Sequence, residues 1–157
     1  MRHEYSTADG PALAEEHDIV YRGLSPGKQA TNPAAGAPAK ATWTRRIVPD
    51  DVLLFRYSAL TFNAHRIHYD RRYVTEVEGY PGLVVHGPLL ATLLVDLLRR
   101  NGVGETLRTL RVPRPQAAVR YCGVRCFAAG PRTTAPVALW AQGPDGAPAM
   151  QATATLP

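Results

Sequence analysis

The stretch that decides the fold is His86-Gly87-Pro88-Leu89-Leu90-Ala91-Thr92-Leu93-Leu94-Val95-Asp96-Leu97-Leu98-Arg99-Arg100. Its leucines recur at intervals of three and four residues, which is the spacing of one side of a helix. Pro88 suits the first helical position, and Arg99-Arg100 followed by Gly102 supplies a C-terminal charge and a stop signal. Because leucine covers much of the circumference, we expect a sheet to wrap this helix.

Upstream of this helix, the sequence predicts a strand and two shorter helices. Thr42–Val48 is expected to be a strand, and Asp50 suits the N-cap of a helix over Asp51–Leu60. An imperfect apolar stripe marks that helix and runs past its end, through Val52, Leu53, Phe55, Tyr57, Leu60 and Phe62. Thr61–Asp70 is expected to be irregular, and Arg71–Val77 a second short helix.

Downstream of the long helix, the chain reads as β-structure. Extended segments separated by Pro and Gly clusters are Leu107–Val112, Ala117–Phe127, Pro136–Gln142 and Ala149–Leu156. Pro144-Asp145-Gly146 predicts a hairpin turn between the last two. One strand, two short helices, one buried helix and four strands predict an α+β class, with a curved antiparallel sheet around a central helix. The single hotdog fold has this order.

The 157 residues suit one domain, preceded by a short non-domain segment. Ser25–Ala41 is rich in Pro and Ala and has no large apolar side chain, so it is expected to be a linker. Glu15–Arg22 is expected to be a short strand. We therefore divide the chain into residues 1–41, a strand remnant with a linker, and residues 42–157, the hotdog domain.

Charge and composition exclude several functional classes. The 18 basic residues exceed the 13 acidic ones by 5, and sixteen of the basic residues are Arg, which favours anionic ligands. No nucleic-acid motif is present, no apolar run is long enough to span a membrane, and the polar start lacks a signal sequence. We expect a cytoplasmic protein. Cys122 and Cys126, more than about 12 Å apart on a strand, are expected to be buried thiols and not a disulfide or metal site.

Unusual polar chemistry gathers between residues 61 and 88. Three of the five histidines, His65, His68 and His86, lie there with Asn63 and with the start of the long helix. The Gly87 amide has no intrahelical partner and lies at the positive end of the helix dipole. It is therefore available to hold a carbonyl oxygen that becomes negative.

Two segments resemble a known family. They are residues 54–70, LFRYSALTFNAHRIHYD, and residues 78–89, EGYPGLVVHGPL. Both are similar to the hydratase segment of MaoC-like hotdog enzymes, and most of all to the FAS1-like dehydratase subgroup of mesaconyl-C4-CoA hydratases and 3-hydroxyacyl-thioester dehydratases. The likeness covers residues 43–156, since residues 137–153 resemble the last two strands of that subgroup.

The resemblance implies (R)-specific hydration or dehydration of an acyl thioester, without a metal or an organic cofactor. It assigns His68 as the catalytic acid/base and the Gly87 amide as the oxyanion donor. MaoC hydratases generally have Asp at the position of Asn63. The FAS1-like subgroup has Asn there, as this chain does. An amide positions a water or hydroxyl but accepts no proton, whereas His does so near neutral pH, so His68 must carry the proton.

Three further residues are candidates for substrate binding or for a structural role. His65 is expected to support the site, because the family's base aligns with His68. His86 forms part of the site wall or binds a loop carbonyl. Arg66, like Arg56, pairs with Asp70 or Glu76 or meets a phosphate of CoA or phosphopantetheine.

The resemblance also implies partners. The expected substrate is an acyl-CoA or an acyl-carrier-protein thioester. Members of the subgroup commonly join two hotdog units, so this chain is expected to carry the second unit only, and to form a homodimer or a heterodimer with another hotdog unit. Two alternatives remain open, namely a non-catalytic hotdog subunit that binds an acyl thioester or a carrier protein, and a hotdog thioesterase.

Overall fold

The computed structural model describes residues 1–16, 41–102, 107–112, 124–129, 136–143, 146 and 148–156, with residues 124–129 described by their backbone. The elements in chain order are β1 (Arg2–Thr7), β2 (Gly10–Glu16), β3 (Trp43–Ile47), α1 (Asp51–Leu60), the 3-10 helix η1 (Arg66–His68), α2 (Arg71–Glu76), α3 (Gly87–Arg100), β4 (Thr109–Arg111), β5 (Val124–Ala129), β6 (Val137–Gln142) and β7 (Pro148–Thr155). This is an α+β arrangement, as the sequence predicts.

Five of the described strands form one antiparallel sheet in the order β3-β5-β6-β7-β4. Strands β6 and β7 form a hairpin in its middle, where Val137 pairs with Ala154 and Leu139 with Ala152. Both strands alternate buried and exposed residues over part of their length, as expected for a sheet with one covered face. The sheet therefore needs one layer against it.

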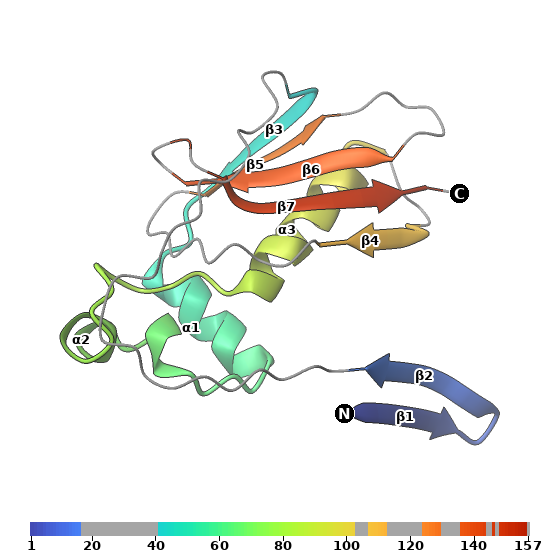
Figure 1. The fold of residues 1–157 in the computed structure, drawn as a ribbon, viewed down its shortest axis with the longest axis horizontal. Helices are drawn as coiled ribbons and strands as arrows, with labels where there is room; N and C mark the ends of the chain where they lie inside the picture. The colour runs from blue at the N-terminus through green and yellow to red at the C-terminus, as the bar shows by residue number, and fades with distance from the viewer. Residues whose placement is uncertain are drawn as a thin grey trace.

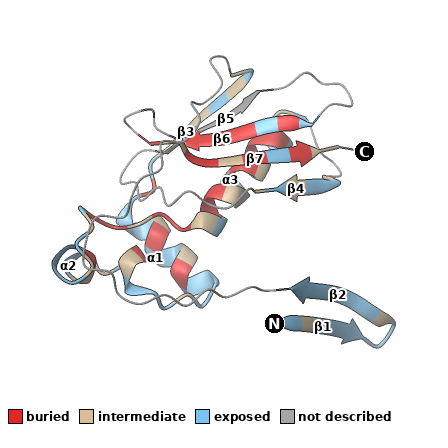
Figure 2. Cartoon of the chain, viewed as in Figure 1, coloured by how far each residue is buried: buried red, intermediate tan, exposed pale blue. Residues whose placement is uncertain are grey.

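That layer is helix α3, which packs across β3, β5, β6 and β7 (Figure 1). Its leucines lie in the core, including Leu94 at 0% exposure, and Figure 2 shows the buried side facing the sheet. Each fully buried leucine contributes roughly 1.5–3 kcal/mol through removal of apolar surface from water. A central helix against a curved antiparallel sheet is the expected hotdog arrangement.

An ion cluster also ties the sheet to the helix. Asp96 of α3 receives hydrogen bonds from Arg45 of β3 and from Arg99 and Arg100 of its own helix. Arg100 and Arg99 hold the pKa of the Asp96 carboxyl well below its usual range. Three guanidinium groups therefore share one partly buried carboxylate at this end of α3.

The remaining helices gather beyond the N-terminal end of α3 (Figure 1). Helix α1 begins as predicted, because the Asp50 carboxylate accepts from the Leu53 amide at 2.8 Å. Its buried residues are Leu54 and Ser58, whereas Val52 and Phe55 of the predicted apolar stripe are exposed. Leu53 and Tyr57 of the same stripe are partly buried against the core, so the stripe mixes residues of the covered side and of the exposed side.

Strands β1 and β2 form a separate two-stranded sheet. Almost all of their residues are exposed (Figure 2), and no other described helix or strand packs extensively on them. The sequence predicted one strand at Glu15–Arg22. The structure has a hairpin over residues 2–16, and residues 17–22 lie outside the described residues together with the linker at 25–40.

The other element predictions agree with the structure to within a few residues. Strand β4 covers only Thr109–Arg111 of the longer segment predicted at 107–112. Strand β5 continues to Ala129, while residues 117–123 of its predicted start are outside the described part. The predicted turn at 144–146 and Cys122 are likewise not described, except for Gly146, and Cys126 is described only by its backbone.

No described helix is both long and apolar enough to span a membrane.

Candidate active site

The polar segment after α1 is folded by its own short-range hydrogen bonds. Phe62 adopts a left-handed conformation with φ of 52°, which turns the chain so that the Asn63 amide donates to the Ser58 carbonyl at 2.9 Å. The Asn63 side-chain oxygen then accepts from the His65 amide at 3.0 Å, as Asn side chains do in turns. This leaves the side-chain NH2 group of half-buried Asn63 as a donor for another group.

His68 ends the 3-10 helix η1 and points inward, with 7% of its surface exposed. Its Nδ1 lies 2.7 Å from the Val84 carbonyl oxygen. A carbonyl only accepts, so Nδ1 carries a proton, and in the neutral ring the lone pair is on Nε2. The Val84 amide in turn donates to the Ile67 carbonyl at 3.0 Å, so the His68 side chain and the backbone just before it are both fastened to Val84.

His86 lies against His68. The two ring centroids are 3.7 Å apart and the planes differ by 18°, which is a stacked arrangement. Nε2 of His86 lies 2.8 Å from the Ser58 hydroxyl, and the Tyr57 ring meets His86 edge-on with centroids 4.8 Å apart. Two adjacent residues of α1, Tyr57 and Ser58, thus hold a histidine that follows them by 29 and 28 positions.

Burial keeps both rings uncharged near neutral pH. Burial, together with a smaller effect of the neighbouring His68, lowers the pKa of His86 from its usual value to about 4. Burial also lowers the pKa of His68, which the hydrogen bond to Val84 partly opposes and the nearby His65 reinforces. A neutral imidazole with a free Nε2 lone pair is a base that is ready to accept a proton.

Gly87 is the first residue of α3, so its amide starts the helix and has no carbonyl four residues earlier within the helix. It directly follows His86, which brings this amide to the same end of α3 as the stacked histidines. A Cβ atom built on Gly87 would meet only the Met150 methyl group, at 4.0 Å. The described part of the chain therefore leaves room beside this amide.

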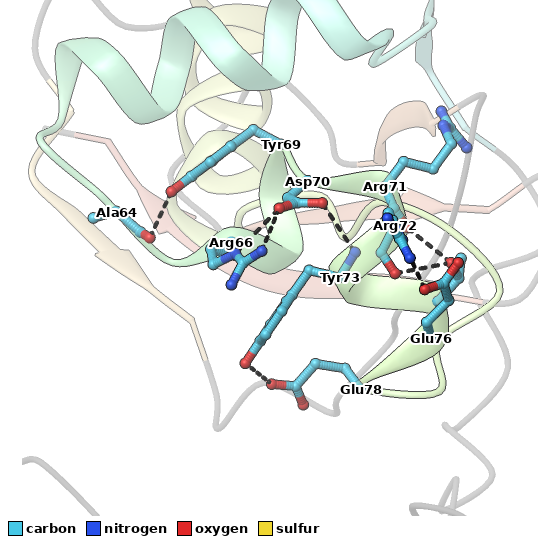
Figure 3. A network of polar contacts seen from close by, with 10 residues as sticks. Ala64, Arg66, Tyr69, Asp70, Arg71, Arg72, Tyr73, Glu76 and Glu78 are labelled. Carbon is cyan, nitrogen blue, oxygen red and sulfur yellow. Dashed lines mark hydrogen bonds and ion pairs between the residues drawn. The ribbon is translucent and has the colours of Figure 1, made fainter.

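Two predicted site residues are on the outer side. His65 is exposed and meets the His68 ring edge-on, with centroids 5.7 Å apart. Arg66 is exposed as well, donates to Asp70 at 2.7 and 3.1 Å and covers the Tyr73 ring at 4.1 Å (Figure 3). The ion-pair alternative for Arg66 is the one present in this arrangement, whereas Glu76 pairs with Arg72 instead.

The sequence analysis missed three groups that hold the two buried histidines in place. Ser58 and Tyr57 hold His86, and the Val84 carbonyl orients His68. One signal was available for Ser58: it follows Leu54 by four residues, so the two share a helix face, and both are buried. A hydroxyl on the buried face of a helix needs a polar partner. No local pattern shows that this partner is His86.

Within the described ranges, no three His, Cys, Asp or Glu side chains gather as a potential metal site.

The family comparison identifies relatives of the chain. The family model for hydroxyacyl-thioester dehydratase type 2 matches residues 1–112. Mesaconyl-C(4)-CoA hydratase of Chloroflexus aurantiacus is 47% identical over 148 residues, which are 92% of this chain and 50% of that protein. The chain therefore spans about half the length of this curated relative.

Solved structures agree in fold. A MaoC-like dehydratase from Phytophthora capsici aligns with a TM-score of 0.59 and 12% identity, over 99% of this chain and 55% of that chain. The R-hydratase PhaJ1 from Pseudomonas aeruginosa aligns with a TM-score of 0.55 and 16% identity, over 71% of this chain and 76% of that one. The fold is thus the predicted hotdog fold. Together with the family match, this shows that the chain belongs to the hydroxyacyl-thioester dehydratase type 2 family.

Proposed function

We propose that this chain catalyses the reversible, (R)-specific hydration of enoyl thioesters, or the dehydration of 3-hydroxyacyl thioesters. One observation carries the proposal: His68 is buried, its Nδ1 is committed to the Val84 carbonyl, and its Nε2 is left as a base next to the N-terminus of α3. The 47% identity to a mesaconyl-CoA hydratase supports the same class of reaction.

In the dehydration direction, His68 Nε2 takes the proton from C2 of the substrate. The electrons of that C–H bond move into the thioester, and its oxygen becomes the negative oxygen of an enolate. The Gly87 amide, at the positive end of the α3 dipole, donates a hydrogen bond to this oxygen. Such a donor acts on charge that develops during the reaction, so it lowers the barrier more than it tightens binding of the substrate.

The second step releases water. The enolate electrons form the C2–C3 double bond while the C3–O bond breaks, and the His68 imidazolium returns its proton to the departing hydroxyl. The Asn63 NH2 group donates to the C3 oxygen and holds it in place, since its side-chain oxygen is already occupied by the His65 amide. His68 is neutral again, and hydration follows the same steps in reverse.

The acyl group is carried on CoA or on an acyl-carrier protein. Both carriers present phosphate through the pantetheine arm, and sixteen of the 18 basic residues are Arg, which recognises phosphate in a bidentate manner. Arg66 is one candidate, because it is exposed and lies in the same 3-10 helix as His68. In that role it would exchange the Asp70 carboxylate for a phosphate.

The active form contains a second hotdog unit, either another copy of this chain or a different polypeptide. The relative from Chloroflexus and the solved Phytophthora chain are each about twice as long as their match to this chain, which covers 50% and 55% of them. The exposed apolar residues next to the candidate site fit such a contact, namely Val52, Phe55, Leu60 and Phe62, at 54%, 60%, 80% and 95% exposure. Light scattering tests this: a strictly monomeric and fully active protein would contradict it.

The decisive experiment is a panel of enoyl and (R)-3-hydroxyacyl thioesters, on CoA and on a carrier protein, assayed with wild type and His68→Ala. We expect conversion by wild type and a loss of about a thousandfold in kcat for His68→Ala, as general acid–base groups contribute about 10² to 10⁴-fold. Thr75→Ala, at an exposed position of α2, is the control and is expected to retain activity.

Three results would contradict the proposal. Release of free thiol would indicate a thioesterase, and binding of the thioesters without any conversion would indicate a non-catalytic subunit. Undiminished activity of a folded His68→Ala protein would remove His68 as the acid/base.

A further inference from the structure

His86 is the most deeply buried polar side chain among the described residues, with 1% of its surface exposed. It occupies the N-cap position of α3 but makes no capping hydrogen bond with its side chain. Ser, Thr, Asp and Asn are favoured at that position because they accept hydrogen bonds from the first helical amides. Capping therefore does not explain why an imidazole is present here.

Packing does not explain it either. Nδ1 of His86 is buried and has no hydrogen-bond partner within the part of the chain that the structure describes. An unpaired buried nitrogen is unfavourable, whereas a phenyl ring would fill a similar space without one. A buried polar group that is kept despite such a cost calls for a functional explanation.

The contacts of His86 converge on the base. One face of its ring stacks on His68 at 3.7 Å, and Nε2 meets the Ser58 hydroxyl at 2.8 Å. The carbonyl of the same Ser58 accepts from the Asn63 amide at 2.9 Å. Ser58 is thus connected to His68 through the His86 ring, and to Asn63 through its own backbone.

The charges of the two rings are linked as well. Two imidazolium ions stacked at this distance would repel each other strongly in a buried site. The pKa of His86 is about 4, so His86 remains neutral when His68 accepts a proton. An uncharged aromatic face attracts a neighbouring cation, so this ring accommodates both charge states of His68.

We propose that Ser58 and His86 are positioning residues for His68: the His86 ring is a neutral platform that orients His68 and keeps water from it, and the Ser58 hydroxyl fixes that platform. This inference rests on the proposed function only where it concerns catalysis. Neither residue needs to touch the substrate, since both act through the His68 ring.

The test compares pH profiles of kcat and KM for His86→Phe, His86→Ala, Ser58→Ala and the double variant Ser58→Ala/His86→Phe. Phe keeps an aromatic face beside His68, and Ala does not. Thr75→Ala is the matched control for Ser58→Ala, because it also removes a helical hydroxyl, one that bonds the Arg71 carbonyl at an exposed site. Circular dichroism monitors folding of each variant.

We expect His86→Ala to lower kcat about 100-fold, because water then reaches the His68 ring. For the same reason, the pH below which kcat falls should move upward, towards about 6.5. His86→Phe is expected to lower kcat at most about tenfold and to leave the acidic side of the pH profile unchanged, since an aromatic ring still stacks on His68. Ser58→Ala is expected to lower kcat about fivefold at unchanged KM, and to have no further effect in the His86→Phe background, since neighbours that act through one group are non-additive.

Two kinetic results would overturn the proposal. If His86→Phe is as impaired as His86→Ala, the nitrogens of His86 take part in the chemistry. If Ser58→Ala lowers kcat equally in both backgrounds, Ser58 acts independently of His86.

An NMR titration of the histidine rings separates this proposal from the proposed function. In wild type, the neutral His68 ring is expected to carry its proton on Nδ1, and the pKa of His68 to lie below about 6.5. Ser58→Ala is expected to raise the pKa of His68. If this shift occurs but no thioester is converted, the link between the rings stands and the proposed function fails. If thioesters are converted but His68 titrates identically in wild type and Ser58→Ala, the positioning role fails.

Discussion

Arg66 and His68 are two residues apart in the same 3-10 helix, yet they belong to opposite kinds of environment. Arg66 lies in an exposed network with Asp70 and Tyr73, whereas His68 is buried against His86. The exposed ion pairs nearby, Arg71 with Asp51 and Arg72 with Glu76, are of the kind that contributes little to stability. The sequence alone shows one polar segment, and burial divides it into an outer surface and an inner site.

The difference shows what burial does to an ionisable side chain. Arg66 is exposed to water, and its hydrogen bond to Asp70 stabilises the charged guanidinium, which raises the pKa of Arg66 above its usual value. His68 and His86 lose water, so their neutral forms are favoured. Changes on the inner side should therefore alter rates and pH profiles, and changes on the outer side should alter little beyond substrate binding.

The largest effect expected from a change that leaves the histidines in place is that of Gly87→Ala. We expect kcat to fall about 10- to 100-fold, because a methyl group beside the amide keeps the thioester oxygen from its donor. Stability should be nearly unchanged, since the new Cβ would meet only the Met150 methyl group at 4.0 Å. Steady-state kinetics and thermal unfolding measure the two effects, and an equally active Gly87→Ala would remove the Gly87 amide from the proposed reaction.

Asn63→Asp should move the pH profile of activity. The carboxylate keeps an oxygen for the His65 amide, and adds a negative charge to the loop that carries His68. An opposite charge favours imidazolium, so the pKa of His68 should rise. Because the base must be neutral, activity should then be lost at a higher pH than in wild type. An unchanged low-pH limb in the active Asp variant would place Asn63 away from the base.

His86 should also make stability depend on pH. In the unfolded chain its pKa is about 6.5, and in the folded protein about 4, so the unfolded state binds more protons between these values. The free energy of unfolding should therefore fall as pH falls from about 6.5 to 4. The unfolding midpoint of His86→Phe should depend less on pH in this window, with Arg72→Ala as the exposed control. An identical dependence in both variants would contradict the assignment.

The smallest effect is expected on the outer side. Arg66→Ala should leave kcat and the unfolding midpoint almost unchanged, because its ion pair is exposed. If Arg66 binds a phosphate of the carrier, KM should rise severalfold, and more at low salt than at high salt. Arg72→Ala is the matched control, since it removes a similar exposed pair. A large loss of kcat for Arg66→Ala would show that the division between inner and outer sides is wrong.

Much of the fold could be predicted from local signals. The Asp50 N-cap places the start of α1, and Pro88 with the leucine repeat places α3, because caps and periodicity depend on residues close in sequence. The stripe of α1 contains both core-packed residues, such as Leu53, and exposed ones, such as Val52, so it does not define the buried side. That side faces His86 through Ser58, a contact across 28 residues.

The candidate site was predicted in composition but not in arrangement. Family resemblance singled out His68, Asn63 and Gly87, and their roles remain proposals. The stacking of His68 on His86 and the anchoring of His68 Nδ1 to Val84 depend on how the segment before α3 lies against η1. Long-range packing decides such contacts, and a sequence pattern does not contain that information.

The β1–β2 hairpin has a consequence for measurements on the intact chain. A two-stranded hairpin is marginally stable in water by itself, and no other described helix or strand packs extensively on β1–β2, whereas β6–β7 is covered by α3. Its ladder amides should exchange with deuterium through local opening, far faster than those of β6 and β7. Amide exchange in this hairpin therefore reports on its surroundings. Slow exchange of the backbone amides of the paired residues Tyr5 and Leu13 would show that another layer of polypeptide covers the hairpin.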